Sequence, residues 1–366
     1  MTPSHLYLHV PFCARRCAYC DFAIAVRRDV PVGDYVKAVE KELAMRKLRG
    51  SELESVYLGG GTPSRLGGEG IARVIEIVRG RFQVVDGTEI TIEANPDDVD
   101  AECAAAWREA GVNRVSLGVQ SFDDSVLRWM HRVHDSESAT RAFGVLRDAG
   151  FDNISVDLIF ALPDSLNRSW DDDLGRALAL EPDHVSLYGL TVEKETPLAK
   201  WSERGEVIPA DENRYASDFL LAHELATAAG YDHYEVSNFS RAGKKSRHNS
   251  AYWTGAAYAG IGPSAHSYDG RTRSWNVREY ADWSSRLARG EPILAGSETL
   301  TEANRASERV YLGLRTTSGL AVTDADRSHT DRWENEGWAT RDGSVVRLTS
   351  EGWLRLDSLA AALTGL

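Results

Sequence analysis

Short apolar runs alternate with longer amphipathic stretches over the first 230 residues of the chain. The apolar runs are typical of buried strands and lie at residues 6–10, 56–58, 89–94, 114–119, 153–160 and 183–188. Helical patterns follow them at residues 34–48, 69–80, 99–110, 123–130 with 136–149, 169–180 and 211–229. Gly111, Gly150 and Gly230 each follow a predicted helix, where a left-handed stop residue is expected. Six successive strand–helix units predict an α/β fold with a parallel sheet.

The number of units and a later change of pattern predict the domain organisation. Six units are too few for the eight-stranded barrel, so we expect a partial, TIM-like (β/α)6 barrel that is open at one side. This barrel and an extension should cover residues 1–290, because the pattern changes near residues 285–300. Residues 291–366 should form a small helical, winged-helix-like domain, with helices at 302–314 and near 324–337, a hairpin at Asp342-Gly343 and a last helix to 364.

Composition and charge narrow the class of protein. Hydrophobic residues make up 42% of the chain and charged residues 27%, which is ordinary for a globular protein. The formal net charge of −13 gives no electrostatic reason to expect a nucleic-acid partner. No apolar run is long enough for a transmembrane segment, and the N-terminus lacks the pattern of a signal peptide. We therefore expect a cytoplasmic protein whose thiols stay reduced.

Three of the four cysteines lie close together, as Cys13-x3-Cys17-x2-Cys20. In a reducing compartment this clustering indicates a metal site. Three thiolates can ligate three irons of a [4Fe–4S] cubane and leave the fourth iron open. An open iron suits S-adenosylmethionine (SAM), whose amino and carboxylate groups can chelate it before an electron cleaves the sulfonium C–S bond. The alternatives are a zinc site, which usually needs a fourth ligand, and buried free thiols. Cys103, in an alanine-rich helical pattern, is expected to be a small core residue.

Polar or glycine positions follow the ends of the predicted strands, where a parallel β/α barrel places its site. They are the Gly59-Gly60-Gly61-Thr62 loop, Glu93, Gln120, Asp157 and Gly189. Each of these alone is more often a turn, capped or solvated residue, and a glycine loop is only a weak signal for a ligand. With a cysteine loop at the same end of the barrel, the set predicts a cofactor shell.

The cysteine spacing after a first strand, with Tyr19 before the last cysteine, resembles the radical SAM superfamily. The wider set of motifs resembles the oxygen-independent coproporphyrinogen III oxidase family over nearly the whole chain. These motifs are His9-Val-Pro-Phe-Cys13, Tyr57-Leu-Gly-Gly-Gly-Thr-Pro63, Glu93-Ala-Asn-Pro96, Gly118-Val-Gln-Ser-Phe122 and Asp157-Leu-Ile-Phe-Ala-Leu-Pro163.

Two branches of that family can be compared at a few positions. The dehydrogenase branch has a longer N-terminal extension and a fourth cysteine where this chain has Phe22. The heme-chaperone branch, HemW, has an H-N-x-x-Y-W motif, and this chain has His248-Asn-Ser-Ala-Tyr252-Trp253. The chain therefore resembles the heme-chaperone branch more closely.

The resemblance implies roles for particular residues. Cys13, Cys17 and Cys20 would ligate the [4Fe–4S] cluster, and Tyr19 would lie against the adenine of SAM. The other SAM contacts would be Tyr7, Gly60, Gly61, Thr62, Glu93, Gln120, Arg132 and Asp157. Gly189 and His266 would line a deeper pocket, and no residue is assigned as catalytic.

His248 follows a basic loop at residues 241–247. The residues alone favour a solvated basic loop that enters a helix, with the histidine satisfied by backbone groups. The resemblance favours heme instead, with His248 as an axial ligand and with Tyr252 and Trp253 against the porphyrin.

The resemblance implies a heme chaperone that binds heme and delivers it to apo-hemoproteins, including membrane-bound respiratory enzymes. One alternative is an oxygen-independent coproporphyrinogen III dehydrogenase of porphyrin biosynthesis. Another is a HemN-like radical SAM methyltransferase. Whether the chain is an enzyme stays open at this point.

Overall fold

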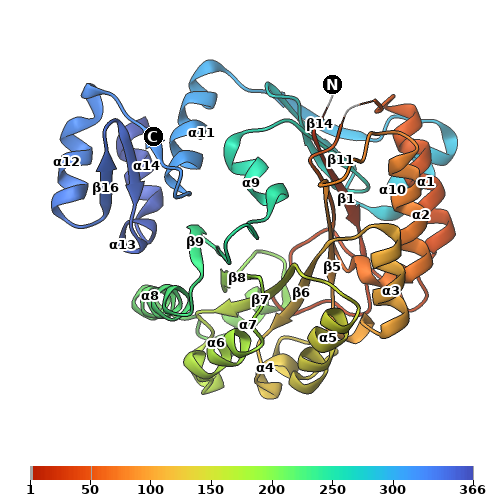
Figure 1. Cartoon of the computed structure of the whole chain (residues 1–366), viewed down its shortest axis with the longest axis horizontal. Helices are drawn as coiled ribbons and strands as arrows, with labels where there is room; N and C mark the ends of the chain where they lie inside the picture. Colours follow the sequence, from red (N-terminus) through yellow and green to blue (C-terminus); the bar gives the residue numbers. More distant parts are fainter. Residues whose placement is uncertain (1–2, 51, 366) are drawn as a thin grey trace.

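The centre of the computed structural model, which describes residues 3–50 and 52–365, is a curved mixed sheet (Figure 1). Its middle consists of the six predicted strands, which run parallel: β1 (His5–Val10), β4 (Ser55–Gly60), β5 (Glu89–Ala94), β6 (Arg114–Gln120), β7 (Ile154–Phe160) and β8 (His184–Gly189). These strands are mostly buried, as expected for parallel strands with near-continuous apolar runs. The predicted α/β fold with six parallel strands is confirmed.

Helices cover the outer, convex face of this sheet (Figure 1). They are α1 (Val32–Met45), α2 (Gly67–Arg79), α3 (Ala101–Ala110), α4 (Asp124–Trp129), α5 (Ser136–Asp148), α6 (Trp170–Ala179) and α8 (Glu212–Ala228). Aspartate side chains cap α3, α5 and α8 by accepting a backbone N–H of the first turn. Gly111, Gly150 and Gly230 have φ of 99°, 85° and 85°, which confirms the predicted left-handed stops.

An extension adds strands at both edges of the sheet. At one edge, β11 (Tyr258–Ile261) pairs parallel with β1, followed outward by β12 (His266–Tyr268), β13 (Thr272–Asn276) and β14 (Leu294–Thr299). At the other edge, β10 (Asn238–Ser240) and β9 (Asp232–Glu235) follow β8. The sheet thus contains twelve strands in the order β14-β13-β12-β11-β1-β4-β5-β6-β7-β8-β10-β9, with two open ends.

Several elements of the barrel and its extension had no sequence prediction. They are the paired strands β2 (Phe12–Cys13) and β3 (Ala25–Val26), and the helices α7 (Pro197–Glu203) and α10 (Tyr280–Arg289). Helix α9 (Arg247–Thr254) was expected after the basic loop, but without bounds. Figure 1 shows α9 within the curve of the sheet, on the face opposite the outer helices. Helix α9 therefore contributes to the interior of the open barrel.

The C-terminal region forms a small three-stranded antiparallel sheet with helices around it. In chain order its elements are α11 (Glu302–Leu314), β15 (Leu320–Ala321), α12 (Arg327–Asn335), β16 (Ala339–Asp342), β17 (Val345–Leu348), α13 (Ser350–Trp353) and α14 (Leu356–Thr364). The predicted helices and the hairpin at Asp342-Gly343 are present, β15 was not predicted, and two helices replace the single last one. The winged-helix-like assignment of this region stays a prediction. Because β14 still pairs with β13 of the large sheet, the division between residues 290 and 291 stays a prediction.

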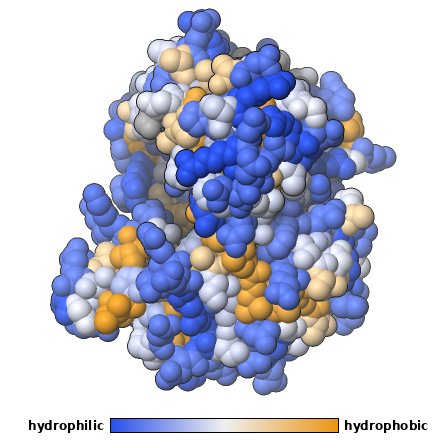
Figure 2. Space-filling view, turned by 90° about the vertical axis from the view of Figure 1, so that its left-hand side faces the viewer, coloured by the Kyte–Doolittle hydropathy of each residue, from blue (hydrophilic) through white to orange (hydrophobic). Residues whose placement is uncertain are grey.

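The C-terminal region packs on the barrel through α8, β9 and α9. Trp353 donates its indole N–H to the carbonyl oxygen of Leu314, and its ring lies 4.4 Å from the ring of His233 in β9. Figure 2 views the molecule from the side of this region. The upper part of the face shown is mainly hydrophilic, and apolar side chains gather in its lower part. Within the described part of the chain, no helix has the length and hydropathy needed to cross a bilayer.

Candidate iron–sulfur and SAM site

The cysteine loop begins where β1 ends, at the edge of the barrel that the strand pattern predicts for the site. Cys13 ends β2 and is buried, whereas Cys17 and Cys20 are half-buried, and all three are free thiols. Backbone hydrogen bonds fix the loop, including Ala18 N to Met130 O at 3.0 Å and Arg27 N to Cys13 O at 3.0 Å. The cysteine loop is thus joined to the barrel through Met130 and closed on itself between Cys13 and Arg27.

Two side chains donate hydrogen bonds to cysteine sulfurs. The Thr62 hydroxyl lies 3.4 Å from Cys13 Sγ, and Arg132 Nη1 lies 3.5 Å from Cys17 Sγ. Burial raises the pKa of the Cys13 thiol and raises that of Cys20 to about 11. A bound metal ion favours the thiolate form, which donors to sulfur also stabilise. The loop therefore has the chemistry of an iron–sulfur ligand set.

The sequence left two kinds of metal site open for the three cysteines, a zinc site and a [4Fe–4S] cluster. The two sites need different arrangements of the thiols. Among residues 3–50 and 52–365, no group of three or more His, Cys, Asp or Glu side chains converges as ligands of one ion. A cubane needs no such convergence, because each of its protein ligands binds a different iron. The three cysteines fit a [4Fe–4S] cluster in this respect.

The glycine loop after β4 passes so close to its neighbours that side chains would clash. Gly60 has φ of 109°, and a Cβ there would lie 2.5 Å from the ring of His9. A Cβ at Gly61 would lie 2.7 Å from the backbone of Pro11. Glycine is thus needed at both positions so that this loop can lie against the cysteine loop.

Glu93, at the end of β5, is fixed by two hydrogen bonds. Tyr57 donates its hydroxyl to Oε1 at 2.8 Å, and the Gly60 backbone N–H donates to Oε2 at 2.9 Å. Burial raises the pKa of Glu93 to about 7, although both donors lower it. The carboxylate is therefore half-ionised near neutral pH and held in one orientation, as suits a group that receives a cationic ligand.

A cavity of about 430 Å³ opens beside the cysteine loop and the glycine loop. Five of the predicted site residues line it: Tyr7, Gly60, Glu93, Tyr252 and His266. The rest of its wall comes from residues that the sequence analysis did not assign: His9, Asp21, Phe22, Ala23, Tyr258, Ser264 and Arg278. Because Asp21 directly follows Cys20, the cavity borders the proposed cluster. Its volume is in the range of small-molecule sites.

A second group of predicted residues gathers around Gly118 on β6. Arg132 donates from Nη2 to Asn95 Oδ1 at 2.7 Å and to the Gly118 carbonyl at 2.8 Å. A Cβ on Gly118 would lie 3.1 Å from Gln120 Nε2, so the amide of Gln120 lies at the same place. The buried Nε of Arg132 has no protein partner among the described residues, which leaves a donor for a ligand. Asn95 belongs to the Glu93-Ala-Asn-Pro96 motif but was not among the predicted site residues.

Asp157 and Gly189, two other predicted site residues, make close contacts within the protein. Asp157 on β7 accepts hydrogen bonds from the hydroxyls of Ser116 and Ser155, at 2.9 and 3.0 Å, and burial raises its pKa. At Gly189, a Cβ would lie 2.2 Å from the ring of Tyr215, so a larger residue there would have to displace that exposed ring. Neither residue lines the 430 Å³ cavity.

Tyr19, within the cysteine loop, and His266, on β12, each contact apolar or aromatic neighbours. Tyr19 packs against a small apolar cluster that includes Met130 and Leu162. The ring of His266 stacks on Trp275 at 5.8 Å. The predicted contact between Tyr19 and adenine stays a prediction.

His248 is buried at the start of α9, with 1% of its surface exposed. Its Nδ1 lies 2.7 Å from Ser55 Oγ and its Nε2 lies 3.0 Å from the Tyr252 hydroxyl. The ring stacks on Tyr57 at 4.9 Å, and burial lowers its pKa to about 3. The imidazole is therefore neutral, and its partners are side chains rather than the backbone groups that the residues alone suggested.

The three residues of the predicted heme motif face different surroundings. Tyr252 lines the cavity beside the cysteine loop, and His248 lies behind it. Trp253 points elsewhere and packs under the guanidinium of Arg315, 4.6 Å from its ring centre. Only Tyr252 of the three lines that cavity.

The chain can now be compared with known proteins. A sequence model of the radical SAM superfamily matches residues 7–175, which include the three cysteines. The heme chaperone HemW of Mycobacterium tuberculosis is 38% identical over 375 aligned positions, which cover 99% of this chain and 95% of that protein. HemW of Bacillus subtilis is 35% identical, with 86% and 84% covered.

A solved structure agrees with the fold. The coproporphyrinogen III oxidase HemN of Escherichia coli, described as a radical SAM enzyme, superposes with a TM-score of 0.83. At 22% identity, over 99% of this chain and 90% of that one, the likeness shows a shared fold and no more. The sequence relatives decide the family: this chain belongs to the HemW family of radical SAM proteins.

Proposed function

We propose that this chain binds heme and delivers it to apo-hemoproteins. The observation that carries the proposal is the 38% identity to the heme chaperone HemW of Mycobacterium tuberculosis over 99% of the chain. The thiol loop and the adjoining cavity support it, because they offer a place for the cluster and SAM of a radical SAM protein. Recipients would include membrane-bound respiratory enzymes.

Residues of the described site have distinct roles in this proposal. Cys13, Cys17 and Cys20 would hold the [4Fe–4S] cluster, which when bound to SAM supplies the electron for cleavage of a sulfonium bond. Glu93 would accept hydrogen bonds from the polar end of SAM, and the buried guanidinium of Arg132 would stabilise the nearby thiolate sulfur. The remaining predicted contacts, including Asp157, Gly189 and Tyr19, are kept as proposals.

We propose His248 as the heme ligand in a state in which Tyr252 has released it. A neutral imidazole with a free nitrogen is a good axial ligand, and the low pKa keeps this ring neutral. Tyr252 occupies Nε2 in the structure and lines the cavity, so its movement would open Nε2 toward that cavity.

A heme titration of the anaerobically reconstituted protein tests both proposals. We expect about one heme per chain, a loss of the ligand-field band on His248→Ala, and transfer of bound heme to an apo-hemoprotein. His329→Ala, an exposed histidine on α12, is the control and should bind heme as the natural chain does. Absence of stoichiometric heme binding would contradict the chaperone function, and an unchanged spectrum of His248→Ala would contradict the ligand alone.

The same preparation tests the enzyme alternative. Incubation with coproporphyrinogen III, SAM and a reductant should give no protoporphyrinogen at turnover rates. Formation of that product would favour the dehydrogenase.

We also propose a cytoplasmic location, because the cluster ligands must remain reduced thiols before the cluster is assembled. Cell fractionation tests this location.

A further inference from the structure

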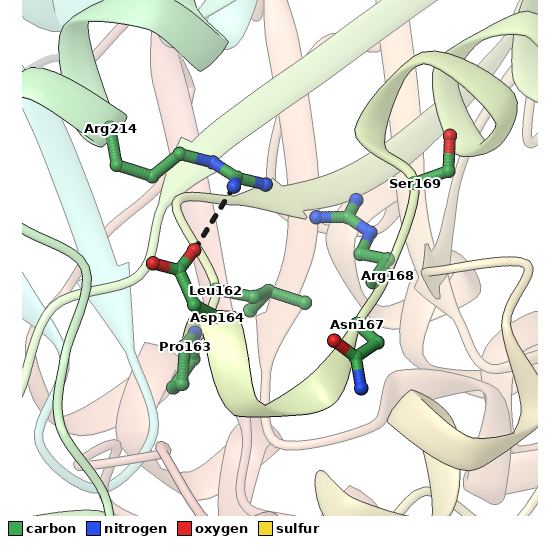
Figure 3. Close-up of a pocket in the computed structure, with 7 residues that line it drawn as sticks. All are labelled: Leu162, Pro163, Asp164, Asn167, Arg168, Ser169 and Arg214. Carbon is green, nitrogen blue, oxygen red and sulfur yellow. Dashed lines mark hydrogen bonds and ion pairs between the residues drawn. The ribbon is translucent and has the colours of Figure 1, made fainter.

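A second cavity, of about 460 Å³, lies in the loop between β7 and α6 (Figure 3). Its wall consists of Leu162, Pro163, Asp164, Asn167, Arg168, Ser169 and Arg214. It shares no lining residue with the cavity beside the cysteine loop, and none of its residues has a role in the proposed function. Its chemistry therefore needs an explanation of its own.

Arg168 is a buried cation whose hydrogen bonds are incomplete. Only 2% of its side chain is exposed, and its Nε donates to Asp173 Oδ2 at 2.6 Å. Its Nη1 and Nη2 atoms are both buried, and neither has a partner among the described residues. Buried N–H groups without acceptors are costly, and such donors in a native protein indicate a missing partner.

Arg214 enters the same cavity from α8. Figure 3 shows its guanidinium and that of Arg168 turned toward each other from opposite walls. Arg214 pairs through Nη1 with Asp164 at 3.0 Å, but the Asp164 side chain is 79% exposed. An ion pair to so exposed a carboxylate is weak and easily replaced. If an anion displaces the exposed carboxylate of Asp164, the two guanidinium groups can hold it between them.

Asp173 and Asp218 fix the two arginines by accepting hydrogen bonds from their Nε atoms. Asp173 also accepts hydrogen bonds from Ser121 Oγ at 2.5 Å and from the Phe122 N–H at 2.6 Å. Asp218 accepts from the Ala161 N–H at 3.1 Å and from Arg214 Nε at 2.8 Å. The buried Nη atoms of Arg168 have no hydrogen-bond acceptor among the described residues, and its Cζ lies 4.5 Å from the ring centre of Trp170.

We propose that this cavity binds a small molecule through a carboxylate or phosphate group held between Arg168 and Arg214. Planar guanidinium groups match both oxyanions with paired hydrogen bonds. The volume of the cavity is larger than one oxyanion and is in the range of small-metabolite sites. The site goes beyond the proposed function and does not depend on heme or SAM.

The test uses the full chain with its cluster reconstituted, and without SAM or heme. Sodium phosphate and sodium acetate are titrated separately by calorimetry, and the melting temperature is compared with that in sodium chloride of equal ionic strength. Saturable binding with a rise in melting temperature is expected for one of the two anions. Saturation by phosphate alone would identify a phosphate ligand, and saturation by acetate alone a carboxylate.

Three variants separate the site from general charge effects. Arg214→Gln should weaken binding of the anion about tenfold or more, since it removes one of the two guanidinium groups. Arg147→Gln is the matched control: its ion pair with Asp183 is 2.6 Å long, and its side chain is 30% exposed against 34% for Arg214. Arg168→Lys keeps the charge beside Asp173 but removes the planar fork, so the variant should fold and bind less tightly.

The proposal is overturned if neither anion differs from chloride. It is equally overturned if Arg214→Gln and Arg147→Gln bind the anion alike, or if Arg168→Lys folds and binds like the natural chain. None of these measurements involves heme, so failure here leaves the proposed function untouched.

Discussion

Replacing Tyr57 with phenylalanine should make the binding of SAM strongly dependent on pH. Tyr57 donates the 2.8 Å hydrogen bond to Glu93, whose pKa is already about 7 because of burial. Loss of a hydrogen bond to a charged group costs about 1.5–3 kcal/mol, which would move the pKa of Glu93 to about 8–9. If the ionised carboxylate binds SAM, affinity at pH 7 should fall roughly 5- to 50-fold, in proportion to the ionised fraction.

The assay is the ratio of the SAM dissociation constants of variant and natural chain, measured from pH 6 to pH 9.5. The ratio cancels the titration of SAM itself, and it should shrink to less than about twofold at the alkaline end, where Glu93 is ionised in both proteins. Tyr231→Phe is the control, because its hydroxyl donates to the backbone oxygen of Pro182, away from the cavity. A ratio that stays constant across the pH range would refute the role of Glu93 ionisation.

Three further predictions concern the two loops of the site. Gly60→Ala should destabilise the protein by about 1–3 kcal/mol in urea unfolding, because its φ is 109° and its Cβ would clash with His9. Gly144→Ala, at an open position of α5, is the control and should be neutral or stabilising by about 0.5–1 kcal/mol. Cys17→Ala should lose most of the bound iron from about four atoms per chain, and Cys103→Ala should keep it; equal iron contents would contradict the ligand assignment. Thr62→Val removes the donor to a cysteine sulfur and should make the cluster potential more negative in redox titration, with unchanged iron content as the control.

The sequence predicted the parallel strands well because burial dominates their composition. The predicted bounds of strand β5, residues 89–94, are those in the structure, and its residues are almost all buried. The extension was not predicted, since its strands are short and their environment is mixed. Strand β13, for example, reads Thr-Arg-Ser-Trp-Asn and is mostly half-buried, so it carries neither an alternating nor a continuous apolar pattern. Helix α9 is eight residues long, too short for a clear helical period.

The candidate site was predicted in part for a similar reason. Strand order alone brings Gly60 and Glu93 to one end of a parallel sheet, the family resemblance adds Tyr7, and the structure places all three on one cavity. The partners of these residues depend on contacts that no local pattern reports. Ser55 and His248 are 193 residues apart in the chain and lie 2.7 Å apart in the fold. Only the structure reveals that both ring nitrogens of His248 have side-chain hydrogen-bond partners.

Tyr252 connects the two proposed ligands of the protein. A chain of hydrogen bonds runs from its hydroxyl to His248 Nε2, from Nδ1 to Ser55, and from Ser55 to His5 at 2.9 Å. With the proton of His248 on Nδ1, the lone pair of Nε2 that iron would take is the one that accepts from Tyr252. Heme ligation by His248 therefore requires Tyr252 to leave its place, and Tyr252 is part of the wall of the cavity proposed for SAM. If SAM in that cavity contacts Tyr252, it binds more tightly to one of the two positions of this side chain, and SAM and heme then change each other's affinity by the same factor.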